Sequence, residues 1–99
     1  MIEVEIDDEG TIRYLKDNEL HREDGPAVEY LDGYKSWWFN GKLHRVDGPA
    51  IECADGTKEW YKHDQLHRED GPAVEYLDGY NAWYIDGKMI KVEYKGVQA

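Results

Sequence analysis

The chain has 99 residues but only one cysteine, Cys53, and no apolar run long enough to cross a membrane. A single thiol cannot form an internal disulfide framework, and it gives no support for a cysteine-based zinc or iron–sulfur site. A bilayer span needs about 20 consecutive apolar residues, so the sequence predicts no membrane-spanning segment. The N-terminus alternates apolar and acidic residues, without the basic start and apolar run of a signal peptide, which favours a cytoplasmic protein.

Positive charge is also scarce. Twelve Lys and Arg stand against 22 Asp and Glu, for a formal net charge of −10. The acidic residues are spread along the chain and no basic patch is segregated, so we expect repulsion from nucleic acid and from anionic lipid. The sequence therefore predicts neither direct nucleic-acid binding nor membrane binding, and it favours a protein partner with a basic surface.

Aromatic residues are abundant: four Trp, eight Tyr and one Phe. A chain of this length buries a smaller share of its surface than a large enzyme does. Each ring removes roughly 150–250 Å² from water. We therefore expect the rings to supply most of the core.

An internal repeat organises the sequence. The phrase Leu-His-Arg-x-Asp-Gly-Pro-Ala occurs at residues 20–27, 43–50 and 66–73, a spacing of 23 residues both times. The ends depart from this pattern, as the terminal units of repeat arrays do. We predict one repeat domain over residues 1–99, with a degenerate unit at 1–25, full units at 26–48 and 49–71, and a capping unit at 72–99.

Each unit has the pattern of a β-hairpin. Alternating residues such as Ala27-Val28-Glu29-Tyr30 indicate a strand, and Asp32-Gly33 or Asp78-Gly79 supplies a tight turn. An aromatic strand follows and ends at a second turn, Asn40-Gly41 or Asp86-Gly87. Glycine recurs too often for a helix. The predicted fold is all-β: an elongated antiparallel meander of about four stacked 23-residue β-hairpin repeats.

Two aromatic ladders follow from the repeat. Trp37, Trp60 and Trp83 share one repeat position, and the next position holds Trp38, Tyr61 and Tyr84. Successive side chains on a strand point to opposite faces. We expect the Trp37 ladder in the core, and a binding surface formed by Trp38, Tyr61, Tyr84, Tyr34 and Tyr80 with the strand acids Glu29, Glu52 and Glu75. The structural alternative is that the second ladder is half-covered by loops or by a dimer mate.

A histidine ladder accompanies the repeat: His21, His44 and His67, each followed three residues later by Asp24, Asp47 or Asp70. His and Asp together suggest a metal site or an acid–base pair. Catalytic sites are usually single constellations, whereas these residues repeat with the scaffold. We therefore expect a structural role, in which Asp caps the turn before Gly and His bonds backbone in the connecting segment. No metal, cofactor or catalytic residue is predicted.

The remaining charged residues of the phrase receive a structural interpretation too. Arg22, Arg45 and Arg68 could pair with nearby acids, and such surface pairs contribute only about 0–1 kcal/mol each. His63 lies outside the repeated phrase and is expected to be incidental.

The segment from Trp38 to Gly48, Trp-Phe-Asn-Gly-Lys-Leu-His-Arg-Val-Asp-Gly, resembles the MORN repeat, whose pattern is Trp-x-x-Gly-x-x-His-Gly-x-Gly. Arg45 replaces a Gly of that pattern and an Asp-Gly-Pro-Ala turn is inserted, as in the variant repeats of bacterial and bacteriophage proteins. The resemblance implies β-hairpin repeats. MORN proteins are described as lipid binders or as dimerisation and scaffolding modules, and the lipid role depends on basic residues that this acidic chain lacks.

Three functions are compatible with these observations. The leading hypothesis is a non-enzymatic protein-binding module; by analogy with short phage proteins it would inhibit a host defence protein, such as a CRISPR protein, by blocking its surface or imitating nucleic acid. The second is sequestration of a small aromatic or nucleotide ligand. The third is a self-assembling structural protein, since open sheet edges favour pairing between copies and a homodimer is one outcome.

Overall fold

The computed structural model describes residues 1–95 and contains only strands, turns and loops there. No helix that could span a membrane occurs among these residues. The prediction of an all-β fold is confirmed. The strands are β1 (Glu3–Ile6), β2 (Ile12–Lys16), β3 (Glu19–Leu20), β4 (Val28–Glu29), β5 (Lys35–Ser36), β6 (Trp38–Phe39), β7 (Lys42–Leu43), β8 (Ile51–Glu52), β9 (Lys58–Glu59), β10 (Tyr61–Lys62), β11 (Gln65–Leu66), β12 (Val74–Glu75), β13 (Tyr80–Ile85) and β14 (Lys88–Tyr94). The last four residues of the predicted capping unit lie outside the described part.

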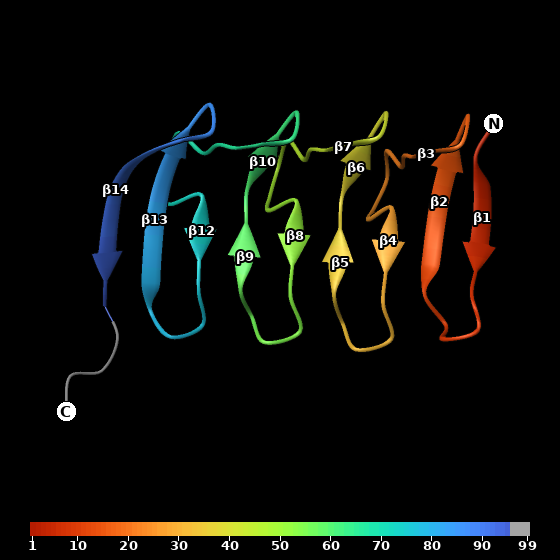
Figure 1. The fold of residues 1–99 in the computed structure, drawn as a ribbon, viewed down its shortest axis with the longest axis horizontal. Helices are drawn as coiled ribbons and strands as arrows, with labels where there is room; N and C mark the ends of the chain where they lie inside the picture. Colours follow the sequence, from red (N-terminus) through yellow and green to blue (C-terminus); the bar gives the residue numbers. More distant parts are fainter. Residues whose placement is uncertain (96–99) are drawn as a thin grey trace.

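Ten strands form one antiparallel meander in the order β1-β2-β4-β5-β8-β9-β12-β13-β14, with β3 paired to β2 beside this path. Figure 1 shows these strands side by side along the long axis, from β1 at one end to β14 at the other. The molecule measures 48 × 29 × 17 Å, so the sheet is elongated and thin, as the repeat predicted.

The aromatic strand of each full unit is divided, which the sequence did not predict. β5 belongs to the main sheet, whereas β6 pairs with β7 in a small separate hairpin, and β10 and β11 repeat this arrangement. The division falls at Trp37 and Trp60, whose backbone N–H groups donate to the carbonyls of Ala50 and Ala73 in the following unit. In the two terminal units the strand runs through, as β2 at one end and as β13, with a register shift after Trp83, at the other.

The small hairpins turn where the sequence predicted. Asn40 and Gly41 both have positive φ, at 50° and 77°, and Asp86 and Gly87 do the same at 48° and 81°. Two consecutive positive φ angles are the geometry of the tight hairpin turns for which Asn-Gly and Asp-Gly are preferred. In the unit between them, His63 and Asp64 adopt the same conformation at 49° and 69°.

Small residues, not aromatic rings, form the fully buried core, and the expectation that the Trp37 ladder would do so is wrong. The buried apolar side chains are Ala27, Val28, Ala50, Ala73, Val74 and Ala82, whereas all four Trp side chains are half-buried. A single sheet 17 Å thick has no second layer to cover large rings. The three buried alanines of the repeated phrase lie where backbone hydrogen bonds join consecutive units.

The cross-strand register separates two faces of the sheet. One carries alternating charges in neighbouring strands, Glu29, Lys35, Glu52, Lys58 and Glu75. Opposite charges directly across a strand pair stabilise a sheet by roughly 0.2–1 kcal/mol per pair. The other face carries the ladder Val28, Ser36, Ile51, Glu59, Val74 and Ala82.

Candidate functional site

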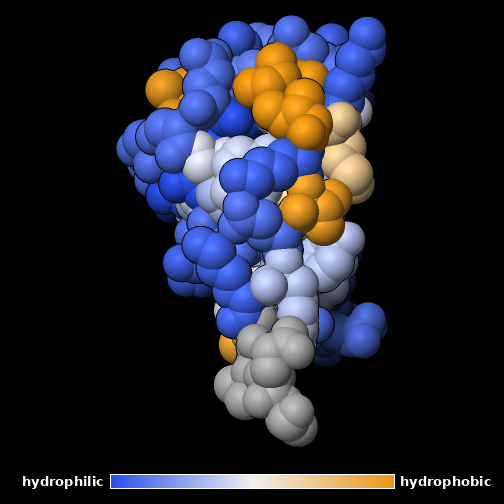
Figure 2. All heavy atoms as spheres, turned by 90° about the vertical axis from the view of Figure 1, so that its left-hand side faces the viewer, coloured by the Kyte–Doolittle hydropathy of each residue, from blue (hydrophilic) through white to orange (hydrophobic). Residues whose placement is uncertain are grey.

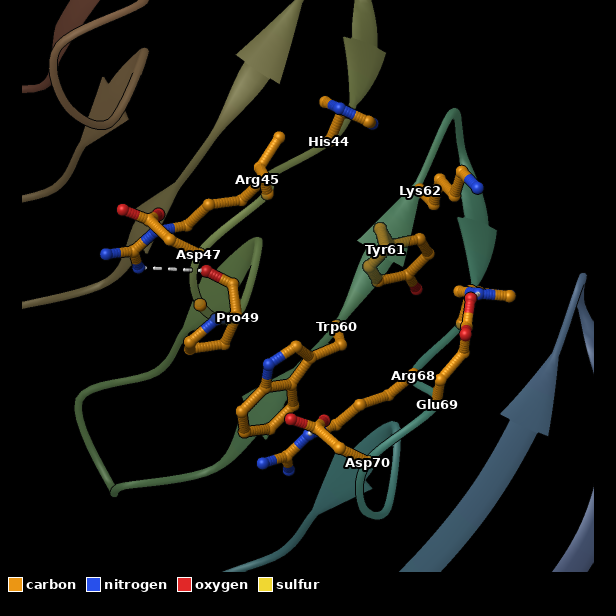
Figure 3. A pocket seen from close by; sticks show the side chains of 13 residues that line it. His44, Arg45, Asp47, Pro49, Trp60, Tyr61, Lys62, Arg68, Glu69 and Asp70 are labelled. Atoms are coloured by element: carbon orange, nitrogen blue, oxygen red, sulfur yellow. Dashed lines mark hydrogen bonds and ion pairs between the residues drawn. The ribbon is translucent and has the colours of Figure 1, made fainter.

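The three repeated phrases lie in a row along the molecule and enclose open grooves. We call the surface formed by residues 20–25, 43–48 and 66–71, with the aromatic side chains between them, the groove face. One groove lies between the first and second phrases and includes Trp37 and Phe39 in its lining. The next lies between the second and third phrases and includes Trp60 and Tyr61. Figure 3 shows these two rings between Arg45, Asp47 and Pro49 on one side and Arg68, Glu69 and Asp70 on the other.

Each groove contains an arginine stacked on an aromatic ring. The Arg45 guanidinium carbon lies 3.9 Å from the Trp37 ring centroid, and Arg68 lies 3.9 Å from Trp60. Arg22 stacks at 4.0 Å on Tyr14, and the Lys91 ammonium lies 4.7 Å from Trp83. Cation–π contacts at partly exposed sites are worth about 0.5–2 kcal/mol. All four units therefore place a cation over the ring at the Trp37 position.

The arginines also hold the turn that follows them. Arg45 donates through Nη1 to the carbonyl of Pro49 at 3.1 Å and through Nε to Asp47 at 3.3 Å. The same two bonds recur for Arg22 and Arg68. The guanidinium of Arg22 lowers the pKa of the Asp24 carboxyl through this hydrogen bond.

The expected role of Asp24, Asp47 and Asp70 as turn caps is therefore corrected: their hydrogen-bond partners are the arginines. The aspartates that cap a turn are those of the main hairpins. Asp32, Asp55 and Asp78 each accept a bond from the backbone N–H two residues later.

The glycine of the phrase makes room for the arginine. A Cβ at Gly48 would lie 2.8 Å from the guanidinium carbon of Arg45, and Gly25 and Gly71 give 2.9 and 2.8 Å to Arg22 and Arg68. Each guanidinium is thus enclosed between an aromatic ring and glycine backbone. The expectation that the arginines form only weak surface pairs is therefore wrong. Each arginine is half-buried and contacts a ring, a carboxylate and a backbone carbonyl.

The strand acids predicted to bind are drawn into the same network. Glu52 lies 3.1 Å from Arg45 and Glu75 lies 2.9 Å from Arg68, while Glu29 is 3.9 Å from Arg22. These carboxylates are only about one-third exposed. Their low exposure makes them poor candidates for contact with another protein.

Other carboxylates of the groove face are far more accessible. Five side chains between 74% and 88% exposed line the grooves: Glu23, Asp24, Asp47, Glu69 and Asp70. The arginine side chains beside them are only 22–23% exposed. The groove face therefore presents more negative than positive charge outward: its arginines are largely covered, and Lys62 adds an exposed cation to the groove between the second and third phrases.

The histidines fasten one unit to the next. Nδ1 of His21 accepts the backbone N–H of Asn40 at 2.9 Å, and Nδ1 of His67 accepts that of Asp86 at 2.9 Å. These N–H groups belong to the positive-φ turns of the following unit, which would otherwise leave them unpaired. The histidines thus bond backbone as expected, but this backbone lies in the next small hairpin and not in the connecting segment.

His44 differs from its two counterparts. Nε2 of His21 lies 3.3 Å from Glu23 and Nε2 of His67 lies 3.1 Å from Glu69, but the residue two positions after His44 is Val46, which is 90% exposed. His44 instead stacks on His63, with ring centroids 4.4 Å apart, and accepts its backbone N–H at 3.2 Å. Burial, then the charges of His63 and Lys62, lowers the pKa of His44. The interpretation of His63 as incidental is wrong.

The predicted aromatic stripe is neither fully exposed nor buried. Trp38, Tyr61 and Tyr84 are all half-buried. Trp38 donates to the Ser36 hydroxyl at 2.8 Å, and Tyr61 donates to Glu59 at 3.0 Å. Burial, followed by the charge of Glu59, raises the pKa of the Tyr61 hydroxyl.

The two outer tyrosines of that stripe lie in local tyrosine pairs. Tyr34 is half-buried with its ring centroid 5.1 Å from that of Tyr30, and burial raises its pKa. Tyr80 is 38% exposed and lies 5.8 Å from Tyr76. Neither Tyr34 nor Tyr80 lines a groove of the groove face, whereas Tyr61 does.

Metal and polyphosphate chemistry find no support in this arrangement. Within residues 1–95 no group of three or more His, Cys, Asp or Glu side chains is placed to hold a metal ion. The three arginines do not converge; each stacks on a different ring and pairs with a different carboxylate. Comparison with family models, with curated proteins and with solved structures gave no match.

The stacked arginine is the feature that sequence reasoning missed, although a signal was present. Eight residues separate ring and cation in every unit: Tyr14 and Arg22, Trp37 and Arg45, Trp60 and Arg68, Trp83 and Lys91. A fixed aromatic–cation spacing that survives even in the last unit indicates a structural contact.

Proposed function

We propose that this chain is a non-enzymatic, acidic protein-binding module that contacts a basic protein surface through its groove face. The observation that supports this most is a difference in exposure: five carboxylates that border the grooves are 74–88% exposed, whereas the stacked arginine side chains, which pair with three of them, are only 22–23% exposed. Such an arrangement steers a basic partner toward the surface and aligns it there. The half-buried rings between the carboxylates supply apolar contact area of the kind found at interfaces.

The proposal includes inhibition of a protein that itself binds nucleic acid, such as a host defence protein. A row of carboxylates along an elongated sheet supports competition for a basic groove. The repeating hairpins likewise support the proposal that the chain is a MORN-repeat variant. A cytoplasmic location fits both proposals.

The test is retention of proteins from a cell lysate on the immobilised chain at low and at high salt. We expect one or few nucleic-acid-binding proteins, released as salt rises because exposed charges are screened beyond about 8–10 Å. The matched variants are Asp24→Asn, Asp47→Asn and Asp70→Asn combined, against Glu3→Gln, Glu5→Gln and Glu9→Gln combined. Both triple variants change the net charge equally, and the first keeps an oxygen acceptor for each arginine. Equal retention on both variants would contradict a role for the groove face.

Self-association is a second candidate, favoured by the exposed end of the sheet. β14 is a seven-residue edge strand on which Met89, Ile90, Val92 and Tyr94 are 39–63% exposed. Figure 2, which looks onto this end of the molecule, shows apolar side chains gathered within a largely hydrophilic surface. Sedimentation at increasing protein concentration tests it: a dimer that Val92→Lys dissociates would support it, and a monomer throughout would exclude it.

A further inference from the structure

The grooves of the groove face recur at a regular distance along the molecule. Each full unit adds two strands to the main sheet, as in the pairs β4–β5 and β8–β9. Neighbouring strands lie about 4.8 Å apart, so one unit advances about 9.6 Å. The two main grooves share the phrase 43–48 as a common wall, so they are separated by one such advance.

Hydrogen bonds between the small hairpins hold the phrases to this spacing. Gly41 donates its backbone N–H to the carbonyl of Leu20 at 2.9 Å, and Gly87 donates to Leu66 at 2.9 Å. In the middle unit Asp64 donates to Leu43 at 2.8 Å. The groove walls therefore follow the period of the main sheet, and a ligand that spans several grooves must match that period.

Both grooves are lined by aromatic rings and carboxylates, and they differ at one repeat position, where Phe39 lines the first groove and Lys62 lines the second. Trp37 and Phe39 line one groove, and Trp60 and Tyr61 line the next. An exposed carboxylate stands at the shared wall, Asp47, and another at the outer wall of each groove, Asp24 and Asp70. An occupant should thus alternate apolar rings with positive charges, once per unit.

We propose that the groove face binds an extended, proline-rich segment of another protein that carries Lys or Arg at every third residue. The polyproline II helix has three residues per turn and rises about 3.1 Å per residue, so it repeats every ~9.3 Å, within a few tenths of an ångström of one unit. Its proline rings would lie against the aromatic side chains, as in other aromatic-lined grooves that accept this helix, and its basic side chains would meet the carboxylates. This inference rests on the proposed function and names the part of the partner that is bound.

Other peptide conformations do not match the spacing. An α-helix repeats its face after two turns, about 10.8 Å, and falls out of register by more than 1 Å per unit. A β-strand presents the same face about every 6.7 Å, which fits neither one unit nor two. Single-stranded nucleic acid brings phosphates to a surface of carboxylates, where like charges repel.

The test is titration calorimetry of the full chain with three peptides of equal charge. The first repeats Pro-Pro-Arg over about 12 residues, so that arginine recurs once per helical turn. The second has the same composition with its arginines unevenly spaced. The third repeats Gly-Ser-Arg, which keeps the arginine spacing but forms a flexible chain.

We expect the periodic proline peptide to bind at least about tenfold more tightly than either control, because only it is preorganised in the matching register. Tyr61→Ala should weaken it several-fold, whereas Tyr94→Ala, at an exposed tyrosine of β14, should leave it unchanged. Equal affinity for all three peptides would overturn the inference while the proposed function stands, since charge alone would explain binding. No binding of the periodic peptide, with lysate proteins still retained through the groove face, would overturn the inference alone. No retention of lysate proteins would instead defeat the proposed function.

Discussion

The guanidinium carbon of Arg45 lies 3.9 Å from the centroid of the Trp37 ring, and the backbone of Gly48 lies against the other side of the guanidinium group. This contact connects the repeat to the proposed function. Because the arginine is held by the ring, by Asp47 and by the Pro49 carbonyl, its charge is directed inward. The carboxylate surface that remains is a consequence of how the unit folds.

Loss of this arginine should therefore destabilise the protein. We expect Arg45→Gln to lower the free energy of unfolding by about 1–3 kcal/mol, since it removes a cation–π contact and three hydrogen bonds from a half-buried site. Urea denaturation followed by tryptophan fluorescence measures this. Lys42→Gln, at an exposed cation on β7, is the matched control and should have almost no effect. Equal small effects of both substitutions would show that the stack contributes little.

The glycine beside the arginine gives a second prediction. Gly48→Ala places a methyl group 2.8 Å from the guanidinium carbon, so the arginine must leave the ring. We expect the free energy of unfolding to fall by roughly 1 kcal/mol in the wild-type background, which is the usual contribution of a cation–π contact. In an Arg45→Gln background the long guanidinium is gone, and the same substitution should cost less. Additive effects in this double-mutant cycle would refute the enclosure of Arg45 by Gly48.

The sequence predicted the periodic parts of this molecule and missed contacts that cross between units. Asn40-Gly41 and Asp86-Gly87 identify their turns because few other residues accept positive φ at both positions. The division of the aromatic strand at Trp37 depends on a backbone bond to Ala50 of the next unit, and no local pattern encodes that bond. The burial of aromatic rings was overestimated because composition does not reveal that the sheet lacks a second layer.

The same limit applies to the candidate site. The acids chosen from the sequence, such as Glu52, lie beside an arginine only after folding, where about one-third of the Glu52 side chain remains exposed, against 87% for Asp47 on the same arginine. Tyr61, chosen because it shares a repeat position with Trp38, does line a groove. Its groove arises from two phrases 23 residues apart, which the period alone does not place face to face.

Acidification should weaken the middle of the array first. The pKa of His44 is lowered in the folded protein, so the unfolded chain binds this proton more readily as pH falls through about 6.5. Stability is therefore greatest above that value and decreases below it, since a proton on Nδ1 would also break the bond from the His63 N–H. Urea denaturation at pH 7.5 and 5.5 measures the change. His44→Asn should reduce the difference in the free energy of unfolding between the two pH values. An unaltered difference in this variant would contradict the attribution of the pH dependence to His44.

Val46→Glu should make the middle unit resemble its neighbours. A glutamate there occupies the position of Glu23 and Glu69, which lie about 3.1–3.3 Å from the Nε2 atoms of His21 and His67. We expect the substitution to raise the pKa of His44, because a carboxylate favours the protonated ring. A proton NMR titration of the imidazole signals measures this, with Val46→Gln as the uncharged control. An unchanged or lowered pKa would show that the unit geometry is not transferable.

The lone thiol should react slowly in the folded protein. Burial, followed by the charges of Asp55, Glu59 and Asp32, raises the pKa of Cys53. Since the thiolate is the nucleophile, a thiol reagent at pH 8 should label the native chain more slowly than the chain in urea. Equal rates in both conditions would indicate that Cys53 is exposed and unperturbed.

The central claim is that a basic protein partner binds the exposed carboxylates of the groove face. The most direct measurement is the affinity of a retained partner, as a function of salt, for the wild type and the two triple variants. We predict that Asp24→Asn, Asp47→Asn and Asp70→Asn together weaken binding by about tenfold or more and flatten the salt dependence, whereas the Glu3, Glu5 and Glu9 variant binds nearly as the wild type does. An equal loss in both variants would attribute binding to net charge alone, and no loss in either would place the contact elsewhere on the molecule.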